Sequence, residues 1–347
     1  MCRLLPDLFR FDYEEIRPLA VRLAPIDRFV ILIWGANPTF DYYIRPRLGD
    51  IPSVMIDLSV PRHAQDIQLR AGDYVLICRY LNRYWSRRVA TARDLAGTGL
   101  LFDDDYVAFL GDRSIPILYR LDVARRTVLP LRRIRHKLTD VLVSTETLKQ
   151  RFRNAQARIL GPVPSAEDLG TAPRCEDGVV RIAFHAQLSH LADHAFAAEI
   201  AHKLAHPAQP VVFDVVGPAG AKGIWAHVPS AQFHSELDWP NYRERCHQVR
   251  ADILIAPMLD TPLNQARSPS KAIDAVRMGA AAVFPRSRPY QELGESVVLV
   301  DGGPESWLIA LRDLIAKRDA LRCRADRLKA EVASWAAQAL TLSRVLR

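Results

Sequence analysis

The residues best suited to chemistry lie in the segment LNQARSPSKAIDAVRMGAAAVFP, which begins at residue 263. Its Ser-Pro pair predicts the start of a helix, with Ser268 as the N-cap and Pro269 at the first helical position. Lys271 then places a cation at the positive end of the helix dipole, where an anion is favoured. A phosphate held between Lys271 and free backbone N–H groups would explain this placement. Asp274 could accept hydrogen bonds from a ribose diol, although a solvated Lys271–Asp274 pair would also explain the spacing.

Three adjacent carboxylates, Asp103, Asp104 and Asp105, follow the apolar run TGLLF. Carboxylates at the end of a strand can act as a general base or position an acceptor hydroxyl, so these residues are candidate catalytic groups. The alternative is an acidic loop that caps the next helix. A tight metal site is disfavoured, because no other His or carboxylate cluster is close in the sequence.

The segment FHAQLSHLADH (184–194) follows another predicted strand, and its polar side chains could line a cleft. Its histidines match no standard zinc spacing, and Ser189 could simply cap a helix. The candidates from this segment are His185, Gln187, Ser189, His190 and Asp193. A weaker pattern, DYYIRPRL (41–48), offers Tyr42, Tyr43 and Arg45 as acceptor-side candidates.

The basic run at 119–138 contains seven Arg or Lys residues and one acid. Its end could form a helix with a basic face, of the kind that lies on anionic lipid, or a simple solvated face. The formal charge of the whole chain is +8, and the excess is spread over both halves. This balance fits phosphorylated ligands or an anionic surface better than nucleic acid.

Short apolar runs alternate with helical patterns along the chain, which predicts parallel sheets covered on both faces. We expect strands at 28–34, 53–59, 73–80, 98–102, 140–144, 179–185, 210–217, 230–235, 251–257, 280–285 and 296–302. We expect helices at 82–97, 192–205, 240–249, 269–278, 304–318 and 319–346. The predicted fold is α/β, with two Rossmann-like doubly wound domains in tandem and a cleft between them.

The stretch at 161–178 is rich in Pro, Gly and acids and has no periodicity, which is typical of a linker. We expect an acceptor-side domain at 1–165, a linker at 166–178, a nucleotide-binding domain at 179–318 and a C-terminal helix at 319–347 that packs back across the domains. The five scattered cysteines, the start of the chain and the absence of a long apolar run predict a cytoplasmic protein with reduced thiols. No P-loop or GxGxxG follows any predicted strand.

Four segments together resemble bacterial glycosyltransferases of the GT-B type, in the group called glycosyl transferases group 1 or family 4. They are DYVLICRY…ARDLAGTGLLFDDD, TDVLVSTETLKQRF, RIAFHAQLSHLADH and RADILIAPMLDTPLNQARSPSKAIDAVRMGAAAVFPRSRPYQEL. The resemblance runs in order through residues 73–301. It implies the GT-B fold and transfer of a sugar from a nucleotide sugar to a glycan, lipid-linked or protein acceptor, in surface-polysaccharide, lipopolysaccharide or glycoprotein assembly. No cofactor or metal is implied beyond the donor substrate.

The resemblance also implies roles for individual residues. Lys271 and Ser270 would contact the diphosphate, and Asn264, Ser268 and Asp274 would belong to the donor site. Arg79 would lie on the acceptor side. The chain departs from the family at Ala266, where the first of two paired acids is expected, and at Gln187, where a Gly is common. A sugar-nucleotide epimerase of the same fold and a catalytically inactive binding or scaffold protein are therefore the alternative functions.

Overall fold

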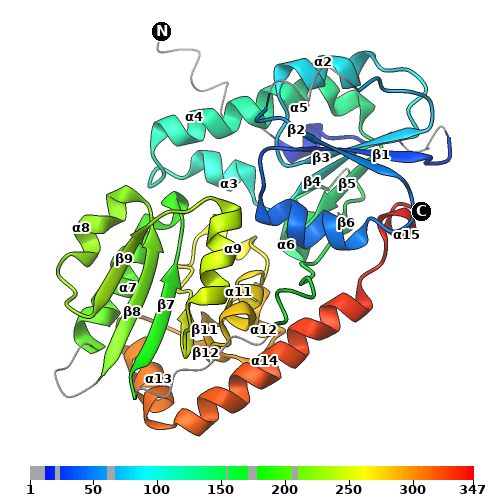
Figure 1. The fold of residues 1–347 in the computed structure, drawn as a ribbon. Coiled ribbons are helices and arrows are strands. Elements are labelled where there is room, and N and C mark those ends of the chain that lie inside the picture. Colours follow the sequence, from blue (N-terminus) through cyan, green and yellow to red (C-terminus); the bar gives the residue numbers. More distant parts are fainter. Residues whose placement is uncertain (1–11, 20–23, 61–66, 154, 171–177, 205–209) are drawn as a thin grey trace. The chain divides into compact units, whose positions relative to one another are not determined.

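The computed structural model describes residues 12–19, 24–60, 67–153, 155–170, 178–204 and 210–347. The chain forms two compact units, and in the described residues each contains one six-stranded parallel sheet with flanking helices (Figure 1). The predicted α/β class with two doubly wound, Rossmann-like sheets is confirmed. The first unit comprises Met1–Val163, Ala266–Ser268 and Ala339–Arg347, and the second comprises Pro164–Gln265 and Pro269–Gln338.

The sheet of the first unit has the strand order β2-β1-β3-β4-β5-β6. Its strands are β1 (Arg28–Ile33), β2 (Ser53–Asp57), β3 (Asp73–Cys78), β4 (Gly97–Phe102), β5 (Asp140–Val143) and β6 (Arg158–Ile159). Strands β3 and β4 are buried along their whole length, which explains their continuous apolar runs. Because β2 and β3 lie on opposite sides of β1, the carboxyl ends of β1 and β3 form a topological switch point, where open α/β sheets bind ligands.

The helices of the first unit connect these strands in the expected βα alternation. The α-helices of this unit are α2 (Arg83–Thr91), α3 (Tyr106–Gly111), α4 (Ile117–Arg126), α5 (Val128–Ile134), α6 (Glu146–Arg151) and α15 (Leu342–Val345). The short turns are η1 (Tyr13–Glu15), η2 (Phe40–Ile44), η3 (Arg45–Arg47) and η5 (Arg135–Lys137).

The prediction that a helix ends at Gly97 is wrong. Asn82 caps α2 by accepting from the Trp85 N–H at 2.8 Å, but the helix ends at Thr91, before an extended Ala92. Gly97 instead pairs with Tyr74 in the sheet, where a Cβ would lie 2.8 Å from the tyrosine ring. The glycine therefore permits close packing between β3 and β4, and it does not cap a helix.

The sheet of the second unit has the strand order β12-β11-β10-β7-β8-β9. Its strands are β7 (Val180–His185), β8 (Val211–Gly217), β9 (Ala231–Ser235), β10 (Ile253–Ile255), β11 (Ala281–Pro285) and β12 (Val298–Val300). This order is the dinucleotide-fold order 3-2-1-4-5-6 read from the other edge, so its switch point lies between β7 and β10. The polar loops that follow β7 and β10 are therefore the expected place for a ligand.

Helices cover both faces of this second sheet. Residues of α7 and α13 pack with β7, β8, β10 and β11 in one buried apolar cluster. Helices α9 and α11 pack together, and α14 contacts both α11 and β11. The helices are η6 (Leu188–His190), α7 (Leu191–Leu204), η7 (Ala219–Ala221), α8 (Lys222–Trp225), α9 (Trp239–Gln248), α10 (Pro262–Gln265), α11 (Lys271–Met278), α12 (Arg288–Gln291), η8 (Gly294–Ser296), α13 (Pro304–Ala316) and α14 (Arg318–Gln338).

Three further boundaries differ from the sequence predictions. Helix α11 begins at Lys271, so the predicted cap at Ser268 is wrong; the residue before the helix is Ser270, whose side chain makes no capping bond. The predicted helix over 319–346 is interrupted, because α14 ends at Gln338 and a short α15 follows within the first unit. The two-residue strand β6 was not predicted. Part of the predicted linker, 171–177, lies outside the described residues, as do Cys2 and Cys175.

Candidate functional site

The start of α11 carries a compact polar cluster in the second unit. The Lys271 ammonium donates to Asp274 Oδ2 at 2.9 Å and to the Tyr242 hydroxyl at 3.4 Å. The Tyr242 hydroxyl donates to the same Asp274 oxygen at 3.0 Å, and the ammonium lies 5.5 Å from the centre of the tyrosine ring. The Lys271 side chain is 28% exposed, whereas that of Asp274 is only 7% exposed. The lysine is therefore more accessible to a ligand than the aspartate.

A second cation, Arg277, ties this cluster to the beginning of the second unit. Its Nη1 donates to Asp274 Oδ1 at 3.0 Å, and its Nε and Nη2 donate to Asp168 Oδ1 at 3.0 and 2.8 Å. The Arg277 side chain is fully buried. Burial alone would raise the pKa of Asp168, but Arg277 and the Ser165 hydrogen bonds lower it. Both Asp274 oxygens thus have protein donors, so a ribose hydroxyl would have to share or displace one of them.

The backbone at the start of α11 offers less to an anion than the sequence predicts. The Ala272 N–H donates to the Pro269 carbonyl at 2.9 Å, and the Ile273 N–H donates to the Ser270 carbonyl at 3.0 Å. Two amides of the first turn therefore already have backbone acceptors. The predicted contribution of open N–H groups is therefore reduced, and the Lys271 ammonium is the cationic group at this position.

His185, the last residue of β7, forms another buried pair. Its Nε2 lies 2.8 Å from Asp214 Oδ2, and Asp214 is also ion-paired with Arg245 and lies 3.3 Å from His234 Nε2. Burial lowers the pKa of His185, and Asp214 opposes this shift. The ring of His185 meets that of Tyr242 edge to face, with centroids 5.6 Å apart. His185 therefore lies next to Tyr242 of the Lys271 cluster, and its role in a donor site stays a prediction. With Nε2–H donating to Asp214, Nδ1 is left as an acceptor.

The other candidates after β7 hold loops together. Asp193 is 3% exposed; its Oδ2 bonds His190 Nδ1 at 2.5 Å, and its Oδ1 accepts from the Leu259 N–H at 2.8 Å. Asn264 donates its side-chain amide to the Leu259 carbonyl at 2.8 Å. These bonds fix the loop after β10 against the start of α7. His190, Asp193 and Asn264 thus shape the loops at the switch point.

Gln187 and Ser189 lie in the turn between β7 and α7. Gln187 is exposed and precedes the 3₁₀ turn η6, without a side-chain capping bond. Ser189 lies inside that turn, so it does not cap α7. The role of Gln187 and Ser189 in a donor site stays a prediction, because none of the contacts described above bears on it.

The candidates of the first unit gather around Arg79, which follows β3. Its Nε donates to the Tyr106 hydroxyl at 2.9 Å, and its Nη1 donates to Thr39 Oγ1 at 3.1 Å. It also pairs with Asp103 at 3.2 Å and with Asp104 at 3.6 Å. Arg79 has φ of 68°, a left-handed conformation that costs a non-glycine residue of order 1 kcal/mol or more. The strained backbone position is therefore the one whose guanidinium pairs with Asp103 and Asp104.

Asp103 and Asp105 have different environments although they are close in sequence. Asp103 Oδ2 accepts from Thr39 Oγ1 at 2.5 Å, and burial raises its pKa, opposed by Arg79. Asp105 is 1% exposed and caps α3 by accepting from the Ala108 N–H at 3.0 Å. It also accepts from the Tyr13 hydroxyl at 3.0 Å. Asp105 therefore fits the capping alternative, and Asp103 is the better candidate for acid–base work.

The acceptor-side candidates from DYYIRPRL are less exposed than the pattern predicts. Tyr42 and Tyr43 are both 3% exposed and belong to the core of the first unit. Arg45 is exposed and pairs with Asp41 at 2.9 Å. Arg47, which was not predicted, is buried and donates to the Tyr43 and Gly161 carbonyls at 3.0 and 2.8 Å. The two tyrosines thus pack, and Arg47 holds their turn in place.

The sequence did not indicate the partners that complete these clusters. Tyr242 lies in α9, in a segment that reads as an ordinary surface helix, and Thr39 lies in the loop after β1. Arg277 looks like a last-turn cation on an exposed helix face. The Trp-Pro-Asn-Tyr start of α9 offered one usable pattern, because two aromatic residues three positions apart share a helix face.

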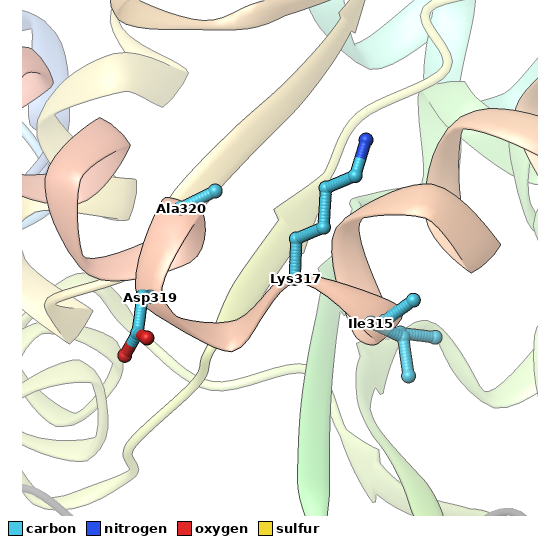
Figure 2. Close-up of a pocket in the computed structure, with 5 residues that line it drawn as sticks. Ile315, Lys317, Asp319 and Ala320 are labelled. Carbon is cyan, nitrogen blue, oxygen red and sulfur yellow. The ribbon is translucent and has the colours of Figure 1, made fainter.

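A surface depression at the turn between α13 and α14 is lined by none of the residues of either cluster. Figure 2 shows its lining residues Ile315, Lys317, Asp319 and Ala320, with the Lys317 and Asp319 side chains pointing in different directions. Lys317, the residue after α13, pairs with Asp313 of that helix at 2.5 Å. No candidate site residue lines this depression, so it has no place in the site.

Within the described part of the chain, no group of three or more His, Cys, Asp or Glu side chains is placed to hold a metal ion. Among the same residues, no helix has the length and apolar character to cross a bilayer.

The fold is similar to several solved structures at low sequence identity. The chain matches the N-terminal domain of Candida albicans trehalose-6-phosphate phosphatase with a TM-score of 0.57 and 9% identity, over 95% of this chain and 97% of that one. It matches Anabaena Alr3699/HepE, in a complex with UDP and glucose, with a TM-score of 0.56 and 11% identity, over 92% and 96%. TarM matches with a TM-score of 0.53 and 9% identity, over 79% of this chain, which spans about half of TarM (53%).

The structural neighbours establish that the chain has the α/β fold of GT-B glycosyltransferases, as the sequence resemblance predicts. No model of a known protein family matches the sequence, and no curated protein matches it.

Proposed function

We propose that the chain is a glycosyltransferase that moves a hexosyl or related group from a nucleotide sugar to an acceptor. The observation that supports it best is the Lys271 ammonium, partly exposed and held by Asp274 and Tyr242 at the switch point of the second sheet. A cation fixed in this way suits a diphosphate leaving group, whose negative charge grows in the transition state. Solved neighbours of the same fold support it too, because one is a complex with UDP and glucose.

Asp274 and Tyr242 act in this proposal as positioning residues for the lysine. Asp274 accepts a hydrogen bond from the Lys271 ammonium, and Tyr242 donates to the same Asp274 oxygen. These bonds restrict the Lys271 side chain, which is otherwise flexible. Ribose binding by Asp274 stays a prediction. It requires a hydroxyl to join Oδ2 beside Lys271 and Tyr242, and a carboxylate oxygen can accept more than one hydrogen bond.

Asp103 is the proposed general base of an inverting transfer. Its pKa is raised by burial, which makes it a better proton acceptor, while Thr39 and Arg79 hold its orientation. Transfer without a metal ion is part of the proposal, with Lys271 supplying the positive charge that a divalent cation would supply elsewhere. If the reaction retains configuration, the leaving phosphate can take the proton and Asp103 is not required.

The acceptor class follows from the sequence resemblance and stays a proposal: a glycan, a lipid-linked precursor or a protein, in the assembly of a surface polysaccharide, lipopolysaccharide or glycoprotein. A cytoplasmic position at the inner membrane face, predicted from residues 119–138, would bring such an enzyme to a lipid-linked acceptor.

A nucleotide-binding protein without transferase activity is the second candidate. Ala266, fully buried, replaces an acid of the family pattern, and both oxygens of Asp274 are engaged by protein donors. Such a protein would bind a nucleotide or nucleotide sugar through Lys271 and transfer nothing.

The test begins with a thermal-shift panel of nucleotides and nucleotide sugars. A ligand present at 100 times its Kd stabilises the folded state by about 2.7 kcal/mol, which raises Tm by roughly 5–10 °C for a domain of this size. Lys271→Ala should remove most of the shift and lower turnover at least a hundredfold, because it deletes the charge that meets the diphosphate. Lys222→Ala, on the exposed start of α8, is the matched control and should leave both unchanged.

The outcomes separate the functions. Undiminished turnover by Lys271→Ala contradicts the assigned donor site. Conversion of a nucleotide sugar without any acceptor would identify an epimerase, and binding without turnover would identify the non-catalytic protein. No shift with any nucleotide would overturn the proposal as a whole.

A further inference from the structure

The structure assigns a docking face for an anionic lipid bilayer to the exposed side of α4 and α5, and this inference is independent of the proposed transfer reaction. We define the α4–α5 outer face as the exposed residues Ile117, Leu118, Arg125, Leu129 and Arg132. The sequence pattern placed the basic region at 119–138. The structure adds the two apolar residues that come just before it.

Helices α4 and α5 form almost one continuous helix, which is why their exposed residues align. The Thr127 N–H donates to the Val123 carbonyl at 2.9 Å, and the Leu131 N–H donates to the Thr127 carbonyl at 3.0 Å, so helical bonding passes through the junction. Pro130 has no N–H for the Arg126 carbonyl, and the Leu81 N–H donates to that carbonyl instead, at 2.8 Å. At 3.6 residues per turn, positions 118, 125, 129 and 132 then share one side of the helix.

The apolar residues of this helix divide between the core and the outer face. Val123, Val128, Leu131 and Ile134 are each at most 4% exposed and pack inward. Leu118 is 77% exposed, Ile117 46% and Leu129 40%. Leu118 is the most exposed large apolar side chain among the described residues. Exposed apolar side chains on a helix are the kind that interfacial helices bury at the boundary between headgroups and acyl chains.

The positive charge of this segment favours an anionic surface over a neutral one. Residues 107–137 contain eight Arg or Lys and two acids, Asp112 and Asp122. Asp122 is paired with Arg126 at 2.9 Å, so this carboxylate offsets the charge of one arginine and the segment keeps a net positive charge. Arg113, Arg125 and Arg132 are exposed in the same segment of the chain as these apolar residues.

Apolar residues in a basic frame fit anionic headgroups above acyl chains. A nucleic acid would leave the exposed Leu118 without an apolar partner, so the charge pattern alone does not favour it.

The experiment is co-sedimentation of the full chain with vesicles. We expect binding to vesicles of phosphatidylcholine with about 30 mol% phosphatidylglycerol, weak binding to pure phosphatidylcholine, and loss of binding as salt rises. Arg125→Ala should weaken binding about fivefold, because each basic residue near an anionic surface contributes about 1 kcal/mol. Leu118→Ser should weaken it at least tenfold through loss of the inserted side chain.

Ile309→Ser is the matched control. Ile309 is 68% exposed on α13 in the second unit, so the substitution removes a similar exposed apolar side chain from a different surface. Because Leu118, Arg125 and Ile309 are all exposed, their variants should keep the wild-type Tm.

Equal effects of Leu118→Ser and Ile309→Ser would overturn the assignment, and so would equal binding to neutral and anionic vesicles. A change of sedimentation coefficient in Leu118→Ser without any vesicle binding would show that the face joins two copies of the chain instead. Vesicle binding is measured without donor or acceptor, so its failure is distinct from failure of the transferase proposal.

Discussion

Replacing Arg277 by Met should destabilise the second unit far more than an equivalent change at the surface. The guanidinium is fully buried and bonds both Asp168 and Asp274 at 2.8–3.0 Å. Methionine fills a similar volume but leaves two buried carboxylates short of a cation. Removing one partner of a buried ion pair costs about 3–5 kcal/mol.

The expected cost is at the lower end of that range, about 3 kcal/mol, because each carboxylate keeps other donors. Asp168 still accepts from the Ser165 N–H at 2.7 Å and lies 3.4 Å from Arg243 Nη2. Asp274 still accepts from Lys271 and Tyr242. For a domain of about 150–250 residues, this loss lowers Tm by roughly 6–12 °C, which differential scanning calorimetry measures directly.

Arg286→Met is the matched control in the same unit. Arg286 pairs with Asp301 at 2.7 Å, a distance like those of Arg277, but the two side chains are 49% and 67% exposed. An exposed pair contributes about 0–1 kcal/mol, so Tm should fall by no more than a few degrees. If both variants unfold at the same temperature, burial does not set the strength of this network.

The double variant Arg277→Met with Asp168→Asn extends the test. Removing the carboxylate charge together with the cation should recover part of the loss, so the double variant should be more stable than the sum of the single effects by about 0.5–3 kcal/mol. Additive effects would show that Arg277 and Asp168 are not coupled, contrary to their two hydrogen bonds.

Two further predictions concern acid–base behaviour. Asp103→Asn should lower the rate of transfer by about 10²–10⁴, since a positioned general base contributes that factor. Asp112→Asn, just after α3, is the control and should leave the rate unchanged. Equal rates for wild type and Asp103→Asn would show that no protein base acts there. The free energy of unfolding should fall as the pH drops from about 7 to 5, because burial lowers the pKa of His194 below that of the unfolded chain, which therefore takes up the proton first. His194 Nδ1 accepts from Trp225 Nε1 at 3.0 Å, so the folded ring resists protonation; a urea-denaturation series in which His194→Gln keeps the wild-type pH slope would contradict this.

The central strands could be predicted from the sequence because both of their faces are covered, so strands such as β3 and β4 are buried along their whole length. The edge strands β2 and β9 are only partly buried and give a weaker apolar pattern. β6 was missed because it has only two residues, too few to make a pattern. Helix ends were less predictable. Gly97 looked like a helix terminator, but its role depends on Tyr74 across the sheet, which no local pattern shows.

In the candidate site, too, some residues could be predicted from the sequence and others could not. Lys271, Asp274 and His185 could be named because chain position alone puts them beside the ends of β7 and β10. Their partners could not be named. Arg277 and Asp168 are 109 residues apart, and only the fold shows that the arginine is buried and paired. Asp105 was assigned with its neighbours as a catalytic group, yet its carboxylate caps α3, a distinction that depends on the backbone direction after β4.

The two units share an arrangement of side chains that no sequence motif predicts and that the similarity to solved structures does not describe. In each, a partly exposed cation at the switch point is held by a carboxylate and a tyrosine hydroxyl: Arg79 by Asp103 and Tyr106, and Lys271 by Asp274 and Tyr242. A long cationic side chain normally loses conformational freedom when it binds an anion. Fixing it beforehand moves that cost from binding into folding, which leaves more of the electrostatic attraction for the ligand. The strained backbone at Arg79 follows the same logic, because strain held by the fold does not have to be created when a ligand arrives.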